Sequence, residues 1–454
     1  MLKDMTNGSE TRHIITFALP MFIGNIFQQL YNMVDSIVVG RYIGKNALAA
    51  VGTSSPIVFF LIAMVMGLSM GASVIISQLY GAGDSKNLKR AVSTAYIFLL
   101  AGGIIITLIG LLFSRSLLRL LQTPEEIFKD ALAYLNIILG GLIFTFAYNA
   151  ISAILRGLGD SKTPLYFLII TSLLNVVLDI WFVSSLGMGV EGAAWATVIS
   201  QAVSVILCLI YIYTKVEILR ILPKDIVFDK ELFSKSVKLG IPSSIQQTVV
   251  SVSMMALQGL VNSYGSVTMA AYAAAARIDS IAMMPIMNLG LASTTFTAQN
   301  IGAGKLDRVK RGYKRSLIIV AVCCIITSII ILSFGPNLIS IFIDVKETEV
   351  IRQGNDYITV VSFFYILMGI MFVTNGVIRG SGDMVASMIS TMTSLGIRII
   401  SAYVLSSIDT IGYRGIWWSL PIGWFIGMTI AILRYRSGKW IEKRVVKKPV
   451  EEPA

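Results

Sequence analysis

Long apolar stretches alternate with short polar segments along almost the whole chain. A helix needs about 20 mostly apolar residues to cross a bilayer, whereas a barrel strand needs about 10 residues of alternating polarity. The stretches here are continuous and rich in Leu, Ile, Ala and Gly, so the pattern predicts an all-α polytopic membrane protein. Twelve spans are predicted, at residues 14–39, 48–79, 92–113, 131–154, 164–185, 192–213, 237–262, 268–298, 316–343, 357–378, 385–406 and 413–434.

Composition and charge agree with a membrane location. Of the 454 residues, 55% are hydrophobic and 14% are charged, against about 25% charged in a typical soluble domain, which excludes a water-soluble protein. Most of the 37 lysine and arginine residues fall in loops on one predicted face. That bias predicts that both termini are cytoplasmic, and it explains the net charge of +12 by contact with anionic lipid rather than nucleic acid.

The two halves of the chain repeat one another at a nearly constant spacing. Gln78 and the segment 81–83 recur as Gln299 and 302–304, and Arg156 recurs as Arg379. Each half contains six spans, so the repeats are parallel and predict two pseudo-symmetric six-helix bundles about an axis along the membrane normal, with a cavity between them. The predicted domains are an N-terminal lobe at 1–213, a cytoplasmic linker at 214–236, a C-terminal lobe at 237–434 and a basic cytoplasmic tail at 435–454.

Polar side chains within the spans are the candidate functional residues, since a carboxylate at the centre of a span costs roughly 2.5–3.5 kcal/mol on insertion scales. In the first span, helical spacing places three polar residues on the face of Asp35, and in the fifth span Asn175 shares a face with Asp179. The other members of this polar set are Gln28, Tyr31, Asn32, Asn149 and Thr197.

An oxygen-rich set of this kind suits a proton or a hard cation such as Na⁺, and it does not suit zinc or copper. In the second half, Asn175 corresponds to Arg398, Asp179 to Ala402 and Thr197 to Leu420. The candidate ligands therefore belong to the first half only, which predicts that the N-terminal lobe couples transport to a cation. The alternative is a hydrogen bond that merely joins two helices.

Three further charges lie within spans, and their roles stay open. Arg277 and Asp279 are two residues apart and cannot face each other on a helix, so each needs a partner from another span. Arg398 is interpreted as a structural cation. Pro20 lies on the same predicted helix as Asp35, which suggests the hypothesis that a charge change at Asp35 biases a bend there.

The sequence predicts transport rather than an enzyme. It has no G-x-x-x-x-G-K-[ST] phosphate loop and no soluble domain for a nucleotide, so an ion gradient is the expected energy source, with no cofactor. The single histidine, His13, cannot build a histidine-based site within the membrane. An intramembrane aspartyl protease would use two acids, but the arrangement of Asp35 and Asp179 argues against one.

The chain resembles the multidrug and toxic compound extrusion (MATE) family, prokaryotic branch. The features that carry the resemblance are two lobes of six spans and the motifs Pro20, Gln28-Gln29-Leu30-Tyr31-Asn32-Met33-Val34-Asp35, Ala49-Ala50-Val51-Gly52, Arg156-Gly157-Leu158-Gly159-Asp160 and Asn175 through Asp179. The resemblance implies an outward-directed antiporter in a bacterial or archaeal cytoplasmic membrane that exchanges H⁺ or Na⁺ for organic, often cationic compounds.

Within the family, the DinF-like subgroup has its cation site in the N-terminal lobe. Asp35, Asn175, Asp179 and Thr197 occupy its matching positions, and Asn149 and Tyr134 are similar to its neighbours. The NorM-like subgroup also uses a carboxylate in the seventh span, but residues 237–262 contain no Asp or Glu. The resemblance therefore favours the DinF-like arrangement.

The alternative function is a flippase for lipid-linked saccharides. Such a protein would carry basic residues in its cavity for pyrophosphate, and only Arg277 and Arg398 lie in the spans. The expected partners are small drug-like substrates and the lipid bilayer, with no nucleic acid or nucleotide, and the chain is expected to be a monomer. The sequence does not distinguish H⁺ from Na⁺ coupling.

Overall fold

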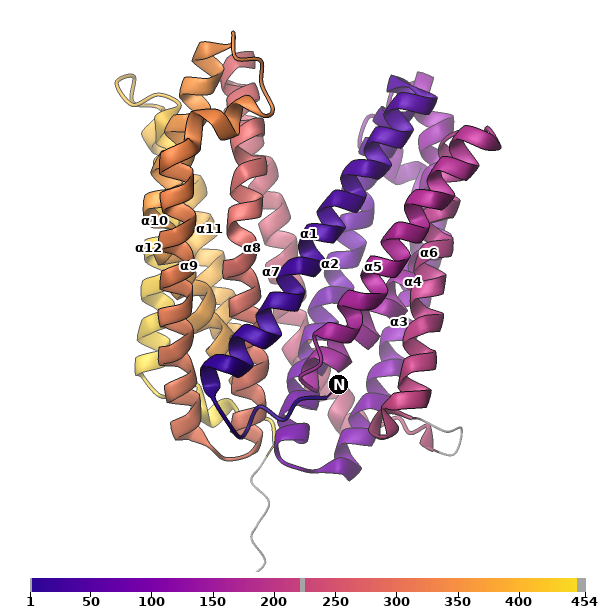
Figure 1. The fold of residues 1–454 in the computed structure, drawn as a ribbon, viewed down its shortest axis with the longest axis vertical. Coiled ribbons are helices and arrows are strands. Elements are labelled where there is room, and N and C mark those ends of the chain that lie inside the picture. The colour runs from indigo at the N-terminus through magenta and orange to yellow at the C-terminus, as the bar shows by residue number, and fades with distance from the viewer. Residues whose placement is uncertain (1, 221–224, 447–454) are drawn as a thin grey trace, which may run out of the picture. The chain divides into compact units, whose positions relative to one another are not determined.

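The structure is a computed structural model that describes residues 2–220 and 225–446. Throughout these residues the regular structure is helical, with twelve long helices and no strand (Figure 1). They are α1 (Glu10–Val38), α2 (Lys45–Gly81), α3 (Ser85–Leu120), α4 (Glu125–Gly157), α5 (Lys162–Asp179), α6 (Gly189–Lys215), α7 (Lys230–Asn262), α8 (Ser266–Gly302), α9 (Leu306–Ser340), α10 (Thr348–Ser381), α11 (Met384–Ser406) and α12 (Arg414–Arg436). The predicted all-α class is confirmed.

Several helices begin before the apolar part of their sequence. α9 starts at Leu306 rather than 316, and α7 starts at Lys230, inside the segment predicted as a linker. Their first turns are rich in charged residues, which a helix tolerates where it leaves the hydrocarbon for water. Of the predicted linker and tail, residues 221–224 and 447–454 lie outside the described part of the chain.

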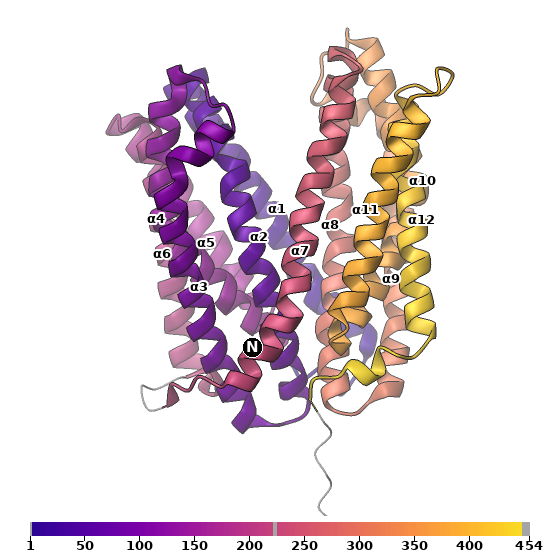
Figure 2. The same cartoon turned by 180° about the vertical axis from the view of Figure 1, so that it is seen from behind.

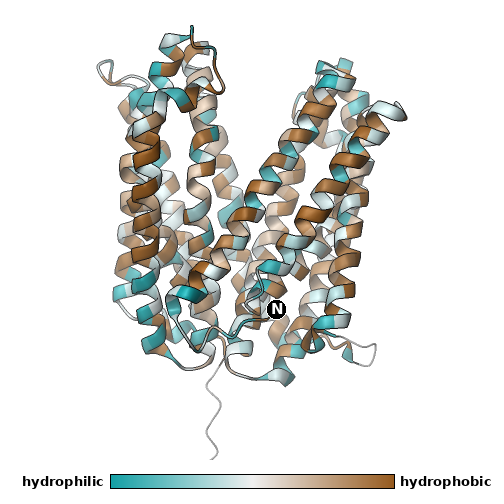
Figure 3. Cartoon of the chain, viewed as in Figure 1, coloured by the Kyte–Doolittle hydropathy of each residue, from teal (hydrophilic) through white to brown (hydrophobic). Residues whose placement is uncertain are grey.

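In the described part of the chain, eleven helices are long and apolar enough to cross a membrane. The twelfth, α7, is more polar because Ser, Thr and Gln recur between residues 243 and 253. Figure 3 shows hydrophobic residues along the middle of many helices and hydrophilic residues near their ends. This banding fits helices that span a bilayer and end in water on both sides.

The chain divides into two compact units. The N-terminal unit comprises Met1–Lys3 and Ile23–Ser244, and the C-terminal unit comprises Asp4–Phe22 and Ile245–Ala454. α1 and α7 therefore each contribute one part to either unit. The two changes of unit, after Phe22 and after Ser244, fall at corresponding positions of the sequence repeat.

In the N-terminal unit, α4 packs against α2, α3 and α6, and α5 packs against α6 (Figure 2). The first part of α7 approaches the backbone of α2 at Gly67 and Gly71, where a β-carbon would collide with Ser244 and with the backbone of Ser236 and Gly240. Small residues allow such close backbone approach between helices in a membrane.

In the C-terminal unit, α10 packs against α8, α9 and α12. Its core contains large aromatic side chains that are almost fully buried, including Tyr357, Tyr365 and Trp417. Tyr365 and Trp417 come from neighbouring helices, and this aromatic core surrounds the one carboxylate of α8, Asp279. Each unit thus places acidic groups inside its own helical bundle.

Candidate functional site

Asp35 and Asp179 come together in the N-terminal unit. Asp35 lies near the end of α1 and Asp179 is the last residue of α5. Each helix continues into a π-helical turn, η1 (Val39–Ile43) after α1 and η2 (Ile180–Ser185) after α5, and the two turns contact each other. Because π-helical turns recur at functional sites, their position beside both acids is notable. The two carboxyl groups lie within hydrogen-bonding reach of one another.

Asn175 holds Asp179 in place and links it to α6. With its amide oriented to suit its neighbours, Asn175 donates from Nδ2 to Asp179 Oδ2 at 2.7 Å and accepts from the backbone N–H of Thr197 at 3.2 Å. Asn175 and Asp179 are 1% and 0% exposed, one helical turn apart on α5. The same spacing that predicted a shared face therefore brings the amide directly onto the carboxylate.

Two tyrosines complete the surroundings of the acids. The hydroxyl of Tyr31 lies 3.4 Å from Thr197 Oγ1, a long contact. Tyr134 on α4 lies within electrostatic range of Asp35, Tyr31 and Asp179. Its ring also packs against the apolar cluster that includes Val38 and Val183, next to the two π-helical turns. The structure thus gathers six of the predicted residues around one point of the N-terminal unit.

The hydrogen bonding of this acid pair is incomplete. Within the described residues, Oδ1 of Asp35 and Oδ1 of Asp179 are buried and have no hydrogen-bond partner. The groups that act electrostatically on either carboxyl group in the described chain include no lysine or arginine. Two carboxylates in contact repel each other strongly unless a proton or cation lies between them. The arrangement can therefore bind a proton or a hard cation with oxygen ligands.

Four other predicted residues have no described side-chain contact with either acid. Gln28 and Asn32 are exposed on α1, and no described side-chain contact joins them to the acids. Asn149 is half-buried on α4 and donates to the carbonyl oxygen of Thr145 in its own helix. Pro20 is buried within α1, on the part of the helix that belongs to the C-terminal unit. None of the four is part of the hydrogen-bonded group around Asp179.

The three further intramembrane charges lie in the C-terminal unit. Asp279 is 6% exposed and accepts from the hydroxyls of Tyr357 at 3.1 Å and Tyr365 at 2.7 Å. Arg277 is exposed, and its guanidinium lies 5.5 Å from the ring centre of Phe342, within cation–π range. Arg398 acts electrostatically on Asp279 from α11.

Sequence reasoning missed the two π-helical turns and the tyrosine partners of Asp279. A π-helical turn differs from an α-helical one by a single backbone hydrogen-bond shift, which hydrophobic periodicity does not report. Tyr357 carried a usable signal, since it is the counterpart of Tyr134 in the sequence repeat. Tyr365 carried none, because it lies in an apolar run without a polar pattern.

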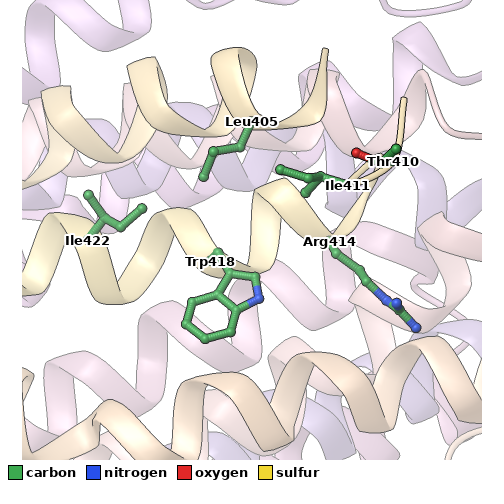
Figure 4. Close-up of a pocket in the computed structure, with 6 residues that line it drawn as sticks. All are labelled: Leu405, Thr410, Ile411, Arg414, Trp418 and Ile422. Carbon is green, nitrogen blue, oxygen red and sulfur yellow. The ribbon is translucent and has the colours of Figure 1, made fainter. Parts of the chain in front are cut away.

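A shallow surface hollow in the C-terminal unit does not coincide with the acids. It lies where α11 ends and α12 begins, as Figure 4 shows, and is lined by Leu405, Thr410, Ile411, Arg414, Trp418 and Ile422. Its lining includes no carboxylate and none of the residues around Asp35 and Asp179. The candidate cation site is therefore defined by its buried side chains rather than by this hollow.

Known proteins share both the sequence pattern and the fold. The MatE family profile matches residues 20–181 and 242–404, so the two matches fall on the two halves of the repeat. The chain is 34% identical over 438 residues to the probable multidrug resistance protein YpnP of Bacillus subtilis, covering 96% of this chain and 97% of that protein. It is 31% identical over 444 residues to the probable multidrug resistance protein YoeA of the same species, covering 96% and 95%.

A solved structure described as a MATE protein in complex with MaL6 superposes with a TM-score of 0.90 at 27% identity, covering 97% of this chain and 99% of the other. The matched residues include helices of both units. The chain thus belongs to the MatE family of multidrug efflux transporters, and it is a membrane transporter rather than an enzyme.

Proposed function

We propose that this protein is a secondary active antiporter that exchanges H⁺ or Na⁺ for organic, often cationic compounds by alternating access. One observation carries the proposal: Asp35 and Asp179 touch inside the N-terminal unit, and each keeps a buried oxygen for which the described residues supply no partner. Such a pair needs a proton or a small cation between its carboxyl groups. If that ion exchanges with solution, its gradient across the membrane can supply the energy for transport. Asn175 and Thr197 are the further proposed ligands, Thr197 as a secondary one because its hydroxyl makes only a long contact, to Tyr31.

The direction and energetics follow from membrane physics. The basic loops support a topology in which both termini are cytoplasmic, and inward movement of a cation then drives outward movement of substrate. One elementary charge crossing 100 mV supplies about 2.3 kcal/mol. Since about 1.4 kcal/mol corresponds to a tenfold ratio, one cation per cycle sustains a gradient of about 45-fold for an uncharged substrate. A monovalent cationic substrate exchanged one for one moves no net charge, so its gradient would be driven by the concentration gradient of the coupling ion.

The substrate class rests on the relatives. YpnP and YoeA are both named as probable multidrug resistance proteins, which supports drug-like organic substrates here. The flippase alternative is not favoured, because no relative named here is described as one and the proposed site is acidic rather than basic. The absence of Asp and Glu from residues 237–262 supports a DinF-like arrangement, in which the cation binds in the N-terminal unit.

Reconstitution tests the proposal. Purified protein in liposomes is given an imposed pH or Na⁺ gradient, and uptake of ethidium is followed by fluorescence. We expect gradient-driven uptake that falls at least tenfold in Asp35→Asn. Asp130→Asn is the matched control. Asp130 is exposed on α4, and its replacement removes the same charge from the same unit. Equal uptake by wild type and Asp35→Asn would show that the coupling site is wrongly assigned.

A further inference from the structure

Helix α7 has three distinct faces within the C-terminal unit. One face is buried, since Ser253 and Leu257 are 1% and 0% exposed. Gln246 lies on the same side of the helix and donates to Thr391 Oγ1 of α11 at 3.0 Å. At about 100° per residue, the two other faces lie about 120° to either side of this buried one. Packing against α11 therefore determines which residues the other two faces present.

The second face of α7 is apolar and exposed. Ile245 and Val252 lie on it, seven residues or two helical turns apart, and are 43% and 58% exposed. Branched aliphatic side chains are at home in hydrocarbon, so this is the face on which α7 meets lipid.

The third face is polar, and residues three or four apart along α7 define it. Its members, called the polar stripe here, are Gln247, Ser251, Met254, Gln258 and Asn262. Met254 is 59% exposed, and Gln258 and Asn262 are also exposed. Gln258 Nε2 donates to Asn262 Oδ1 at 2.8 Å, which uses one donor and one acceptor of the two amides. Their other polar groups would cost free energy in hydrocarbon, so this face meets water.

The polar stripe is duplicated in the sequence repeat. Four of its positions recur in α1, 222 residues earlier, as Asn25, Gln29, Asn32 and Ser36. Gln29, Asn32 and Ser36 are exposed. Both halves of the repeat therefore keep an exposed polar stripe, although the acid pair occurs in the first half only. Met254 is the one position of the four at which a thioether replaces a polar side chain.

We propose that the polar stripe of α7 is a contact surface for the transported organic compound. The flexible thioether of Met254 adapts to aromatic and aliphatic groups, and the amides of Gln247 and Gln258 donate and accept hydrogen bonds. Residues 245–262 contain no charged side chain, so the stripe admits cationic and neutral compounds alike. The inference rests on the proposed function for the class of substrate only, and it requires no coupling ion.

Cysteine labelling in detergent tests which face meets water. The three native cysteines are replaced by Ala, and modification of single cysteines by the water-soluble cationic methanethiosulfonate MTSET is timed. We expect Met254→Cys and Gln258→Cys to react about tenfold or more faster than Val252→Cys, because the reactive thiolate is disfavoured in hydrocarbon or detergent. Val252→Cys is the matched control, since Val252 and Met254 are 58% and 59% exposed on the same helix.

Two further measurements test contact with the substrate. Excess ethidium should slow modification of Met254→Cys but not of Lys346→Cys, because Lys346 is exposed in the loop between α9 and α10. In liposomes, Met254→Cys modified with MTSET should need about fivefold more ethidium for half-maximal uptake than the same variant modified with the anionic reagent MTSES. Fivefold corresponds to about 1 kcal/mol, the repulsion between two like charges about 4 Å apart in water. A purely structural role of Met254 would not distinguish the sign of the added charge.

The proposal is overturned if Val252→Cys reacts as fast as Met254→Cys and Gln258→Cys, or if ethidium protects neither stripe variant although the wild-type protein transports it. Should Met254→Cys fail to fold, Gln258→Cys serves for the same comparisons. Failure of the proposed antiport is a separate outcome. Asp35→Asn would then transport ethidium like wild type, while the labelling contrast and the protection by ethidium would persist.

Discussion

Asn175 donates to Asp179 at 2.7 Å while its oxygen accepts the backbone N–H of Thr197 at 3.2 Å, so one amide joins α5 to α6 at the acid pair. This contact orients the carboxylate whose other oxygen has no described partner. A cation site requires its ligands to be positioned in this way, because the ion is bound only when the ligand oxygens converge on one point.

Replacing Asn175 with Ala should weaken cation-driven transport without abolishing folding. Loss of a hydrogen bond to a charged group amounts to about 1.5–3 kcal/mol, or roughly a ten- to hundredfold rise in the cation concentration for half-maximal ethidium uptake. Asn149→Ala is the control, because the Asn149 amide bonds within its own helix. If the half-maximal cation concentration rose as much in Asn149→Ala as in Asn175→Ala, that result would argue against a specific role for Asn175.

The Tyr31 contact should matter much less. Its hydroxyl is 3.4 Å from Thr197 Oγ1, beyond the usual length of a strong O–H···O bond. We therefore expect Tyr31→Phe and Thr197→Val to change the half-maximal cation concentration less than about fivefold, since the loss is below about 1 kcal/mol. If Thr197→Val were as damaging as Asn175→Ala, the hydroxyl itself would be a principal ligand.

Close helix packing in the N-terminal unit predicts a stability effect at Gly71. A β-carbon there would lie 2.6 Å from the backbone nitrogen of Gly240 and would also collide with the carbonyl oxygen of Ser236. Gly71→Ala should lower the melting temperature by several degrees, as overpacking costs about 1–3 kcal/mol. Gly102→Ala on α3 has nothing within 4 Å of the new carbon and should change it little. Equal melting temperatures for Gly71→Ala and Gly102→Ala would mean that α2 and α7 separate easily.

Asp160, between α4 and α5, predicts a pH dependence of stability. Burial raises its pKa, but hydrogen bonds outweigh that effect and leave its pKa below the ordinary value of 3.8; Thr163 contributes two, at 2.7 Å and 3.0 Å. A lowered pKa in the folded state means that the stabilisation is present above pH 3.8 and is lost as the pH falls through the folded value.

Thermal unfolding in detergent checks this sign. Asp160→Asn should lower the melting temperature at pH 7, and its difference from wild type should shrink below about pH 4. Thr163→Val, which removes one of the donors, should show a smaller loss with the same pH trend. A difference that grows on acidification would contradict the assignment.

The helical architecture and most residues of the candidate site can be predicted from the sequence. Hydrophobic length predicts helices because a bilayer admits few alternatives, and the repeat predicts two bundles because each half carries six such helices. Helical spacing also paired Asn175 with Asp179 and Tyr31 with Asp35, since residues three and four apart share a face.

What the sequence could not provide was proximity between helices. Contact between Asp35 and Asp179 joins residues that are far apart in the chain, and no periodicity encodes it. The amides of Gln28 and Asn32 share the face of Asp35 but are exposed, because a shared face on α1 does not determine what packs against it. The tyrosine pair around Asp279 depends likewise on how α8 meets α10.

The most direct test reverses the direction of coupling. Liposomes containing the protein and either a pH-sensitive dye or ²²Na⁺ are given an outwardly or inwardly directed ethidium gradient with no cation gradient. Because coupling between two ligands is reciprocal, we predict that the substrate gradient drives H⁺ or Na⁺ uphill in the opposite direction, and that Asp35→Asn/Asp179→Asn does not. Substrate movement by the wild-type protein without movement of either ion would contradict the account.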